Sequence, residues 1–242
     1  MPKSPPERPA SEHGYFAWSR DPAVGLFAVL PLWVAYEVLR ILLTPQERNG
    51  AELLMLDVLG LMGSRGLVLL RILFLAGVVL AAVSLLRRQI PWLRVAAVSA
   101  LEGMLYGLLL GPLAAAMATS VRRVLAAPGL RAVDLVGALG AGVFEELVFR
   151  LGLMSLLVLL GTKATRAFGL PRGLALGAAI GTSAVLFAAF HHLLGEPFQQ
   201  GVFVFRTAAG VLLGMLMWLR GYGVCVYAHA LYDLHYYLTQ EP

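Results

Sequence analysis

The sequence predicts an all-α protein: a polytopic bundle of about seven transmembrane helices with a polar cavity within the membrane. The first observation is composition, because 59% of the 242 residues are hydrophobic and only 14% are charged, whereas soluble domains carry about a quarter of charged residues. The second is the recurrence of apolar stretches long enough to cross a bilayer. The third is that ionisable side chains interrupt these stretches at the spacing of one helical face.

The net charge of +5 does not indicate a nucleic-acid partner. The basic residues are scattered between the apolar stretches, where they act as topology signals and favour an N-terminus inside and a C-terminus outside the cell. They are nearly all arginines, which is typical of a bacterial chain, so we expect an integral protein of the bacterial inner membrane. The single cysteine, Cys225, excludes an intrachain disulfide and is expected to be a small apolar residue in a helix.

The N-terminal part of the chain is expected to comprise a tail and three spans. Residues 1–21 are polar and proline-rich, without the apolar core of a signal peptide, and predict a flexible tail. Residues 22–131 form the N-terminal membrane part. Its first connection, residues 44–65, has an amphipathic middle that is expected at the membrane interface. The three spans are expected at residues 23–43, 66–86 and 95–117.

Four ionisable residues fall within these three spans. Glu37 and Arg40 are three residues apart, which predicts an ion pair at a helix end. Arg71 and Glu102 lie deeper, and either pair with each other or line the cavity.

The C-terminal membrane part, residues 132–242, carries the motifs on which the functional prediction depends. Its first apolar stretch, residues 132–160, is too long for one straight span. The other spans are expected at residues 173–194, 202–219 and 223–238.

Glycines in this part predict where helices approach closely or bend. Gly137, Gly140 and Gly142 come just before a pair of glutamates. Two further patterns predict close-packing faces on the following helices: Gly173-x-x-x-Gly177-x-x-x-Gly181 and Gly210-x-x-x-Gly214.

The glutamate pair is Glu145-Glu146, followed by Arg150. Each charge in a membrane helix costs roughly 2.5–3.5 kcal/mol on insertion scales, so such residues pair, line a wet cavity or do chemistry. Glu146 and Arg150 are four residues apart and can form an internal ion pair. Glu145 is rotated by about 100° on an α-helix, which leaves it free to face another group.

Histidines on two later helices supply the rest of the polar set. His191 follows Phe187 by four residues, and His229 precedes Asp233 by four, so each pair shares one helical face. Three helices can then bring Glu145, His191 and His229 together. Taken singly, these pairs are also explained as an ion-pair tether and as polar contacts between helices. The remaining histidines, His192 and His235, are expected to be structural or interfacial.

A carboxylate and an imidazole in a dry site can activate a water for attack on an amide. A second imidazole can hydrogen-bond the developing oxyanion. Together they would hydrolyse a peptide without a covalent intermediate. Two histidines and a glutamate are also a common zinc set, but the chain lacks an HExxH helix, so no cofactor is expected and zinc stays an open alternative.

The ordered motifs Glu145-Glu146-x-x-x-Arg150, Phe187-x-x-x-His191 and His229-x-x-x-Asp233 resemble those of the CPBP family. This family comprises CAAX-type, Rce1-like and bacteriocin-processing intramembrane proteases. The resemblance covers residues 132–238 and implies a helical membrane fold with a conical cavity that opens to the bilayer.

The resemblance also implies roles for the motif residues. Glu145 and His191 would activate the water, and His229 and Asp233 would stabilise the oxyanion. Glu146 and Arg150 would hold the geometry of the site. The chain departs from the family at Asp233, where relatives often have Asn, because an ionised aspartate cannot donate a hydrogen bond to an oxyanion. Asp233 is therefore either protonated or acts by orienting His229.

The sequence thus predicts an intramembrane endopeptidase in the lipid bilayer. Its substrate is expected to be a membrane-associated protein or peptide, cut near a membrane-embedded or membrane-adjacent segment, with removal of a C-terminal sorting tail as the favoured case. One alternative is a non-catalytic immunity or scaffold protein of the same family. Another is a proton-coupled transporter, which the lack of an internal inverted repeat disfavours.

Overall fold

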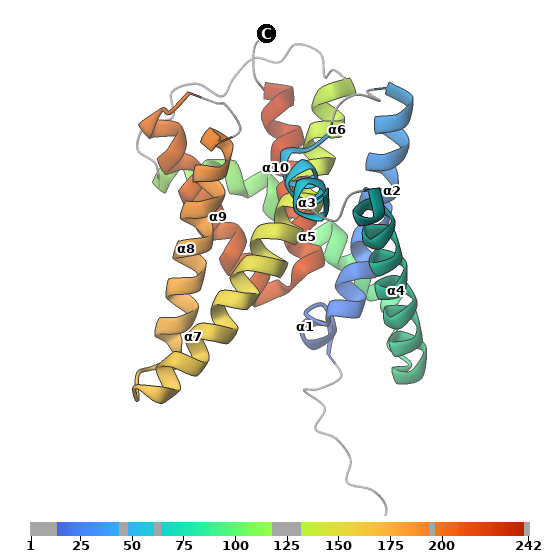
Figure 1. Cartoon of the computed structure of the whole chain (residues 1–242), viewed down its shortest axis with the longest axis horizontal. Helices are drawn as coiled ribbons and strands as arrows, with labels where there is room; N and C mark the ends of the chain where they lie inside the picture. Colours follow the sequence, from blue (N-terminus) through green and yellow to red (C-terminus); the bar gives the residue numbers. More distant parts are fainter. Residues whose placement is uncertain (1–13, 44–47, 61–63, 118–131, 194–196, 240–242) are drawn as a thin grey trace, which may run out of the picture.

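The computed structural model describes residues 14–43, 48–60, 64–117, 132–193 and 197–239. Every regular element in these ranges is a helix, and the helices pack into one bundle in which α10 ends at the upper side (Figure 1). The all-α prediction is therefore confirmed over the described ranges. The helices are α1 (Tyr15–Trp18), α2 (Pro22–Leu43), α3 (Gly50–Gly60), α4 (Ser64–Arg88), α5 (Trp92–Met117), α6 (Ala132–Gly140), η2 (Ala141–Met154), α7 (Ser155–Ala167), α8 (Arg172–Leu193), α9 (Gln200–Arg220) and α10 (Tyr222–Thr239).

Residues 14–21 pack against the bundle at its lower end (Figure 1). Trp18 contacts a buried cluster that includes Leu85 of α4. The Tyr15 hydroxyl donates a hydrogen bond to the carboxylate of Glu102 in α5. The prediction of a flexible tail is therefore wrong for these residues, because contacts with distant helices hold them in place. The residues before them lie outside the described ranges.

Helix α2 begins with the local signals of a helix N-terminus. Pro22 is its first residue, where proline fits, and the Asp21 carboxylate accepts a hydrogen bond from the backbone N–H two residues on, at 2.9 Å. Asp21 also pairs with Arg88, the last residue of α4. At the other end of α2, the predicted pair of Glu37 and Arg40 is present at 2.8 Å.

A cluster of polar side chains connects α5 with the C-terminal end of α9. The Arg220 guanidinium donates to the Glu102 carboxylate at 2.7 Å and lies 4.2 Å from the centre of the Phe16 ring. Glu102 therefore has Arg220 and Tyr15 as its partners. The pairing of Glu102 with Arg71 stays a prediction, because the Arg71 side chain lies outside the described part.

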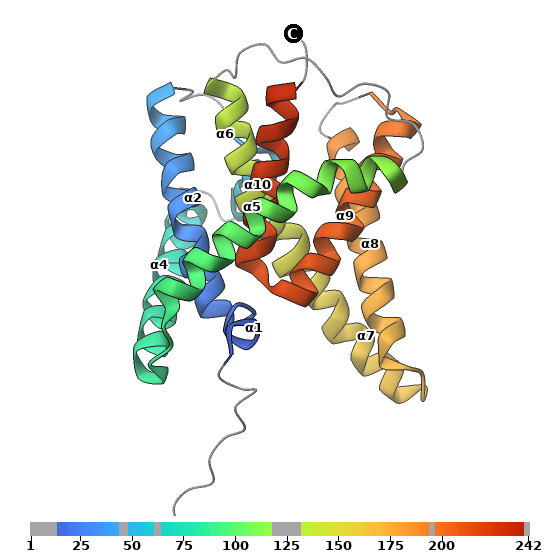
Figure 2. The same cartoon turned by 180° about the vertical axis from the view of Figure 1, so that it is seen from behind.

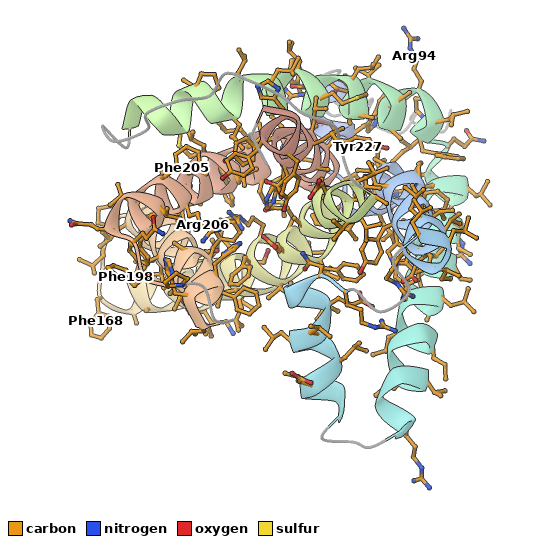
Figure 3. All side chains as sticks on the ribbon, turned by 90° about the horizontal axis from the view of Figure 1, so that it is seen from above. Arg94, Phe168, Phe198, Phe205, Arg206 and Tyr227 are labelled. Atoms are coloured by element: carbon orange, nitrogen blue, oxygen red, sulfur yellow. The ribbon has the colours of Figure 1, made fainter. Side chains whose placement is uncertain are left out.

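Helix α3 occupies the middle of the connection expected at residues 44–65. Its first turn is buried at Ala51 and Glu52, whereas Leu53, Leu54 and Val58 are exposed. Viewed from above, α3 and α4 lie side by side and project away from the central helices (Figure 3).

Helices α5 and α10 pack with their backbones close together, and α5 crosses in front of α10 in Figure 2. A Cβ atom added to Gly103 would lie 2.6 Å from the carbonyl oxygen of Val224, and one added to Gly107 would lie 2.6 Å from that of Ala228. Glycine is required at both positions because real Cβ contacts are longer than this. The contact fixes the depth of α10 in the bundle.

The long apolar stretch that begins at residue 132 is a continuous helical run of three parts, α6, η2 and α7. The middle part, η2, is a wide π-helix of 14 residues. Gly140 packs against the Tyr36 ring, and a Cβ added to Gly142 would lie 2.8 Å from the carbonyl oxygen of Val226 in α10. Close approach at these two glycines is therefore confirmed.

The small-residue patterns of α8 and α9 behave differently from each other. Gly210 and Gly214 of α9 pack against Ala184 and Ile180 of α8, which confirms that close-packing face. The face predicted at Gly173, Gly177 and Gly181 is wrong, because an added Cβ at each of these positions would meet no atom within 4 Å among the described residues.

Four helices in the described ranges are long and apolar enough to cross a membrane: Pro22–Leu43, Trp92–Leu113, Gly173–Leu193 and Gln200–Arg220. The exposed side chains agree with a lipid-facing surface, since Phe168 and Phe198 are 78% and 67% exposed and lie at the outer edge of the molecule (Figure 3). The count of seven spans and the polar cavity stay predictions.

Candidate active site

The π-helix η2 carries the glutamate pair and the arginine at the centre of the bundle. Glu145 is 6% exposed, and Glu146 and Arg150 are fully buried. Side chains from neighbouring helices bind its backbone carbonyls: Tyr222 donates to Val143 at 3.3 Å, and Ser183 donates to Phe149 at 2.8 Å. Wide turns of this kind occur frequently at functional sites.

Glu146 is the centre of a buried network. One of its carboxylate oxygens, Oε1, lies 3.2 Å from the Arg150 guanidinium, so the predicted ion pair is present. The other, Oε2, accepts a hydrogen bond from the thiol of Cys225 at 2.9 Å. Arg150 further donates to the carbonyl of Gly210 at 3.4 Å and lies 4.3 Å from the centre of the Phe187 ring. Glu146 and Arg150 therefore connect η2 with α8, α9 and α10.

The imidazole of His229 lies between the two glutamates. Its Nδ1 is 2.7 Å from Glu146 Oε1, and because an ionised carboxylate only accepts hydrogen bonds, Nδ1 carries the proton. Its Nε2 then points towards Glu145 Oε2, at 3.9 Å, and Asp233 Oδ2, at 3.6 Å. The predicted neighbours His229 and Asp233 are thus close, at a separation longer than a hydrogen bond.

The imidazole of His191 is held by its own helix. Its Nδ1 lies 2.9 Å from the carbonyl oxygen of Phe187, and because a carbonyl only accepts, Nδ1 carries the proton here too. Nε2 of the neutral ring is then an acceptor, and it faces Glu145 Oε2 at 3.8 Å. The Phe187 ring packs against both histidines, with ring centres 5.0 Å from His191 and 5.8 Å from His229.

The carboxylate of Glu145 has two unlike oxygens. Oε1 accepts a hydrogen bond from the side-chain amide of Asn49 at 3.1 Å. Oε2 is buried, has no hydrogen-bond partner among the described residues, and faces both histidines. The structure thus brings together the six residues that the sequence singled out, with one acceptor oxygen directed at two imidazoles.

Two members of the cluster were not predicted from the sequence. Asn49 lies 96 residues from Glu145 in the chain, and no periodic pattern marks it. Cys225 was expected only as a small apolar residue, although it binds Glu146. In contrast, His192 packs on the rings of Phe198 and Phe203, in keeping with the structural role expected of it.

The chemistry available to this cluster is that of a carboxylate beside two imidazoles. Within the residues that the structure describes, no three His, Cys, Asp or Glu side chains are arranged to hold a metal ion. Glu145 Oε2 is the only carboxylate oxygen of the glutamate pair that lacks a hydrogen-bond donor there.

The fold and the site define a class: an integral, helical membrane protein with a buried glutamate–histidine centre. Residues 127–235 match the family model described as type II CAAX prenyl endopeptidase Rce1-like. This part of the chain is therefore an Rce1-like domain, and the resemblance to the CPBP family is confirmed. The family is one of membrane proteases, which supports a CAAX-type peptidase function. No curated protein and no solved structure matches the chain.

Proposed function

We propose that the protein is an intramembrane endopeptidase that cleaves a membrane-associated protein or peptide with a water activated by Glu145 and His191. The observation that carries this proposal is Glu145 Oε2, a buried acceptor with no hydrogen-bond donor among the described residues. It lies 3.8 Å from His191 Nε2 and 3.9 Å from His229 Nε2. These separations are longer than direct hydrogen bonds, which is consistent with a water held by the three groups.

In the proposed reaction, Glu145 takes a proton from the water as the oxygen attacks the scissile carbonyl. Carboxylates in water-poor sites are effective general bases. His191 presents its Nε2 lone pair to the same water, because Nδ1–H is held by the Phe187 carbonyl. The proton that Glu145 receives then passes to the leaving amine, which restores the carboxylate.

His229 is the proposed donor to the oxyanion. In this role it carries protons on both ring nitrogens: Nδ1–H donates to Glu146, and Nε2–H donates to the developing negative charge. Asp233 lies 3.6 Å from Nε2 and balances the imidazolium charge together with Glu146. This assignment gives Asp233 an orienting role, so the protein does not need a donor at the position where relatives often have Asn.

The proposed substrate carries its cleavage site next to a membrane-embedded or membrane-adjacent segment. The described spans support this, since the glutamates are buried among helices that are apolar enough to cross a bilayer. We favour removal of a C-terminal sorting tail in the bacterial inner membrane.

The test compares the N- and C-termini of membrane-associated proteins in cells that carry either the wild-type chain or Glu145→Gln. Removing a general base lowers rates by roughly 10²–10⁴-fold, so a defined set of proteins should keep an uncut terminus in the variant at normal abundance of the protease. Glu37→Gln, the same change at the end of α2, is the matched control and should process normally. Full processing by Glu145→Gln would refute the proposed mechanism.

The same comparison separates the alternatives. A binding or scaffold protein, or a transporter, would show unchanged termini in the variant and in a full deletion. A set of termini that changes in both would identify the substrates and the sequence at which they are cut.

A further inference from the structure

Asn49, which comes directly before α3, is a polar residue from the N-terminal part of the chain that contacts the glutamate centre. Its side-chain amide donates to Glu145 Oε1 at 3.1 Å. The residue comes from the connection between the first two expected spans, which carries none of the three motifs.

The orientation of the Asn49 amide is fixed from its other side. Its Oδ1 accepts a hydrogen bond from the backbone N–H of Ala51 at 2.8 Å, which caps the first turn of α3. If the amide were flipped, its oxygen would face the Glu145 carboxylate and its NH₂ group would face the backbone N–H of Ala51. Only the observed orientation forms a hydrogen bond with both neighbours. The NH₂ group must therefore face Glu145.

The backbone of Asn49 is held as firmly as its side chain. Its N–H donates to the Tyr36 hydroxyl at 3.3 Å, and Tyr36 is fully buried and donates to Glu52. A Cβ atom added to Gly140 would lie 2.9 Å from the Cβ of Asn49, so the residue is packed directly against the start of η2. The donor is thus preorganised by α2, α3 and α6.

We propose that Asn49 is a positioning residue for the reaction, an inference that rests on the proposed role of Glu145 as the base. By occupying Oε1, Asn49 fixes the rotation of the carboxylate and leaves Oε2 as the oxygen that faces His191 and His229. It acts through Glu145 and does not touch the substrate.

Two substitutions at Asn49 separate the hydrogen bond from the helix cap. Asn49→Ser keeps a hydroxyl that caps α3 but is too short to reach Glu145. Asn49→Asp keeps the shape and the cap but replaces the donor with a second carboxylate. Asp21→Ser, a similar change at the cap of α2, is the matched control because Asp21 lies at the other end of that helix from Tyr36.

The activity measurement uses the full chain in lipid nanodiscs and a synthetic peptide that spans a cut site found by the comparison of termini. Groups that orient a reacting side chain are typically worth roughly 10- to 100-fold. We expect Asn49→Ser to lower kcat by that factor with little change in KM. Asn49→Asp should move the acid limb of the pH–rate profile to higher pH, because two adjacent carboxylates hold one proton between them. Asp21→Ser should leave kcat and the profile unchanged.

A double-mutant cycle tests the contact without relying on activity. The unfolding midpoints of Asn49→Ser, Glu145→Ala and the double variant should be non-additive, because the two side chains share one hydrogen bond. Additive midpoints, or an unchanged kcat in Asn49→Ser, would overturn the proposal. If Glu145→Gln processes normally, the proposed function fails instead, whereas coupling in the cycle would still establish the Asn49–Glu145 bond.

Discussion

At the scale of single residues, the glutamate centre assigns opposite environments to two adjacent carboxylates. Glu146 forms an ion pair with Arg150 and accepts hydrogen bonds from His229 and Cys225. Glu145 has a donor at one oxygen and none among the described residues at the other. This difference suits one glutamate for holding the helices together and the other for accepting a proton.

The structural role of the pair leads to a prediction about stability. Removing one partner of a buried ion pair typically costs about 3–5 kcal/mol, because the other charge stays buried. Arg150→Ala should therefore lower the free energy of unfolding by about that amount, towards the lower end because Glu146 keeps His229 as a partner. Reversible unfolding in mixed detergent micelles measures the change.

The pair at the end of α2 supplies the control for this measurement. Arg40 and Glu37 are also close in sequence and 2.8 Å apart, but Glu37 is 27% exposed. Partly exposed pairs contribute about 1 kcal/mol or less, so Arg40→Ala should have a small effect. Equal losses in Arg40→Ala and Arg150→Ala would show that burial of the Glu146–Arg150 pair does not matter.

At the scale of the elements, the contact of α5 with α10 decides where His229 and Asp233 lie. The two helices touch at Gly103 and Gly107, so any side chain there would push α10 outwards. The histidine and the aspartate are carried on that same helix, at a depth that the contact sets.

Gly103→Ala should lower both stability and activity. Forcing a methyl group into a well-packed contact costs typically 1–3 kcal/mol, and the resulting shift of α10 should lower the cleavage rate. Gly77→Ala in α4 is the matched control, because an added Cβ there meets nothing within 4 Å, and alanine is the better helix former by about 1 kcal/mol. A stable and fully active Gly103→Ala would contradict the predicted role of the contact. The measurements are the unfolding midpoint and the cleavage rate of Gly103→Ala and Gly77→Ala.

The helical segments were predictable because the length of each apolar stretch can be read directly from the sequence. The π-helix could not be predicted from the sequence, although the ion pair of Glu146 and Arg150 was predicted. A helix with i→i+5 hydrogen bonds turns by roughly 80° per residue, so residues four apart still share a face, as they do in an α-helix. The spacing rule therefore held without revealing the wider geometry.

At the scale of the whole molecule, the N-terminal part completes the site that the C-terminal motifs begin. Helices α2 and α5 pack against α10, and α2 also packs against α6. Asn49 reaches Glu145 from the same N-terminal part. The Rce1-like match, in contrast, begins at residue 127.

The C-terminal segment that contains most of the Rce1-like match should therefore not be active by itself. Residues 132–242 expressed alone should accumulate poorly and process no substrate, since the α10 surface that faces Gly103 and Gly107 would lose its partner. Co-expression with residues 1–131 as a separate chain should restore part of the processing. Immunoblotting and the analysis of termini measure the two effects. Activity of the C-terminal segment alone would contradict the role assigned to Asn49 and α5.

The limits of sequence-based prediction are also clearest at this scale. The six candidate site residues were identifiable because each belongs to a local motif whose spacing is that of one helical face. The contacts of Tyr15 with Glu102 and of Asn49 with Glu145 join residues 87 and 96 positions apart. No local pattern encodes such contacts, so the docked N-terminal segment and the donor to Glu145 became visible only in the structure.

The hydrogen bond from His191 to the carbonyl of Phe187 has a consequence for mutational scanning. In a serine-protease triad, an aspartate side chain orients the histidine and can be deleted. Here a main-chain oxygen orients the ring, and every amino acid at position 187 supplies it. Substitutions of Phe187 thus report on the contacts of its ring with His191, His229 and Arg150. The carbonyl group that sets the tautomer of His191 is unchanged in any scan that changes only side chains.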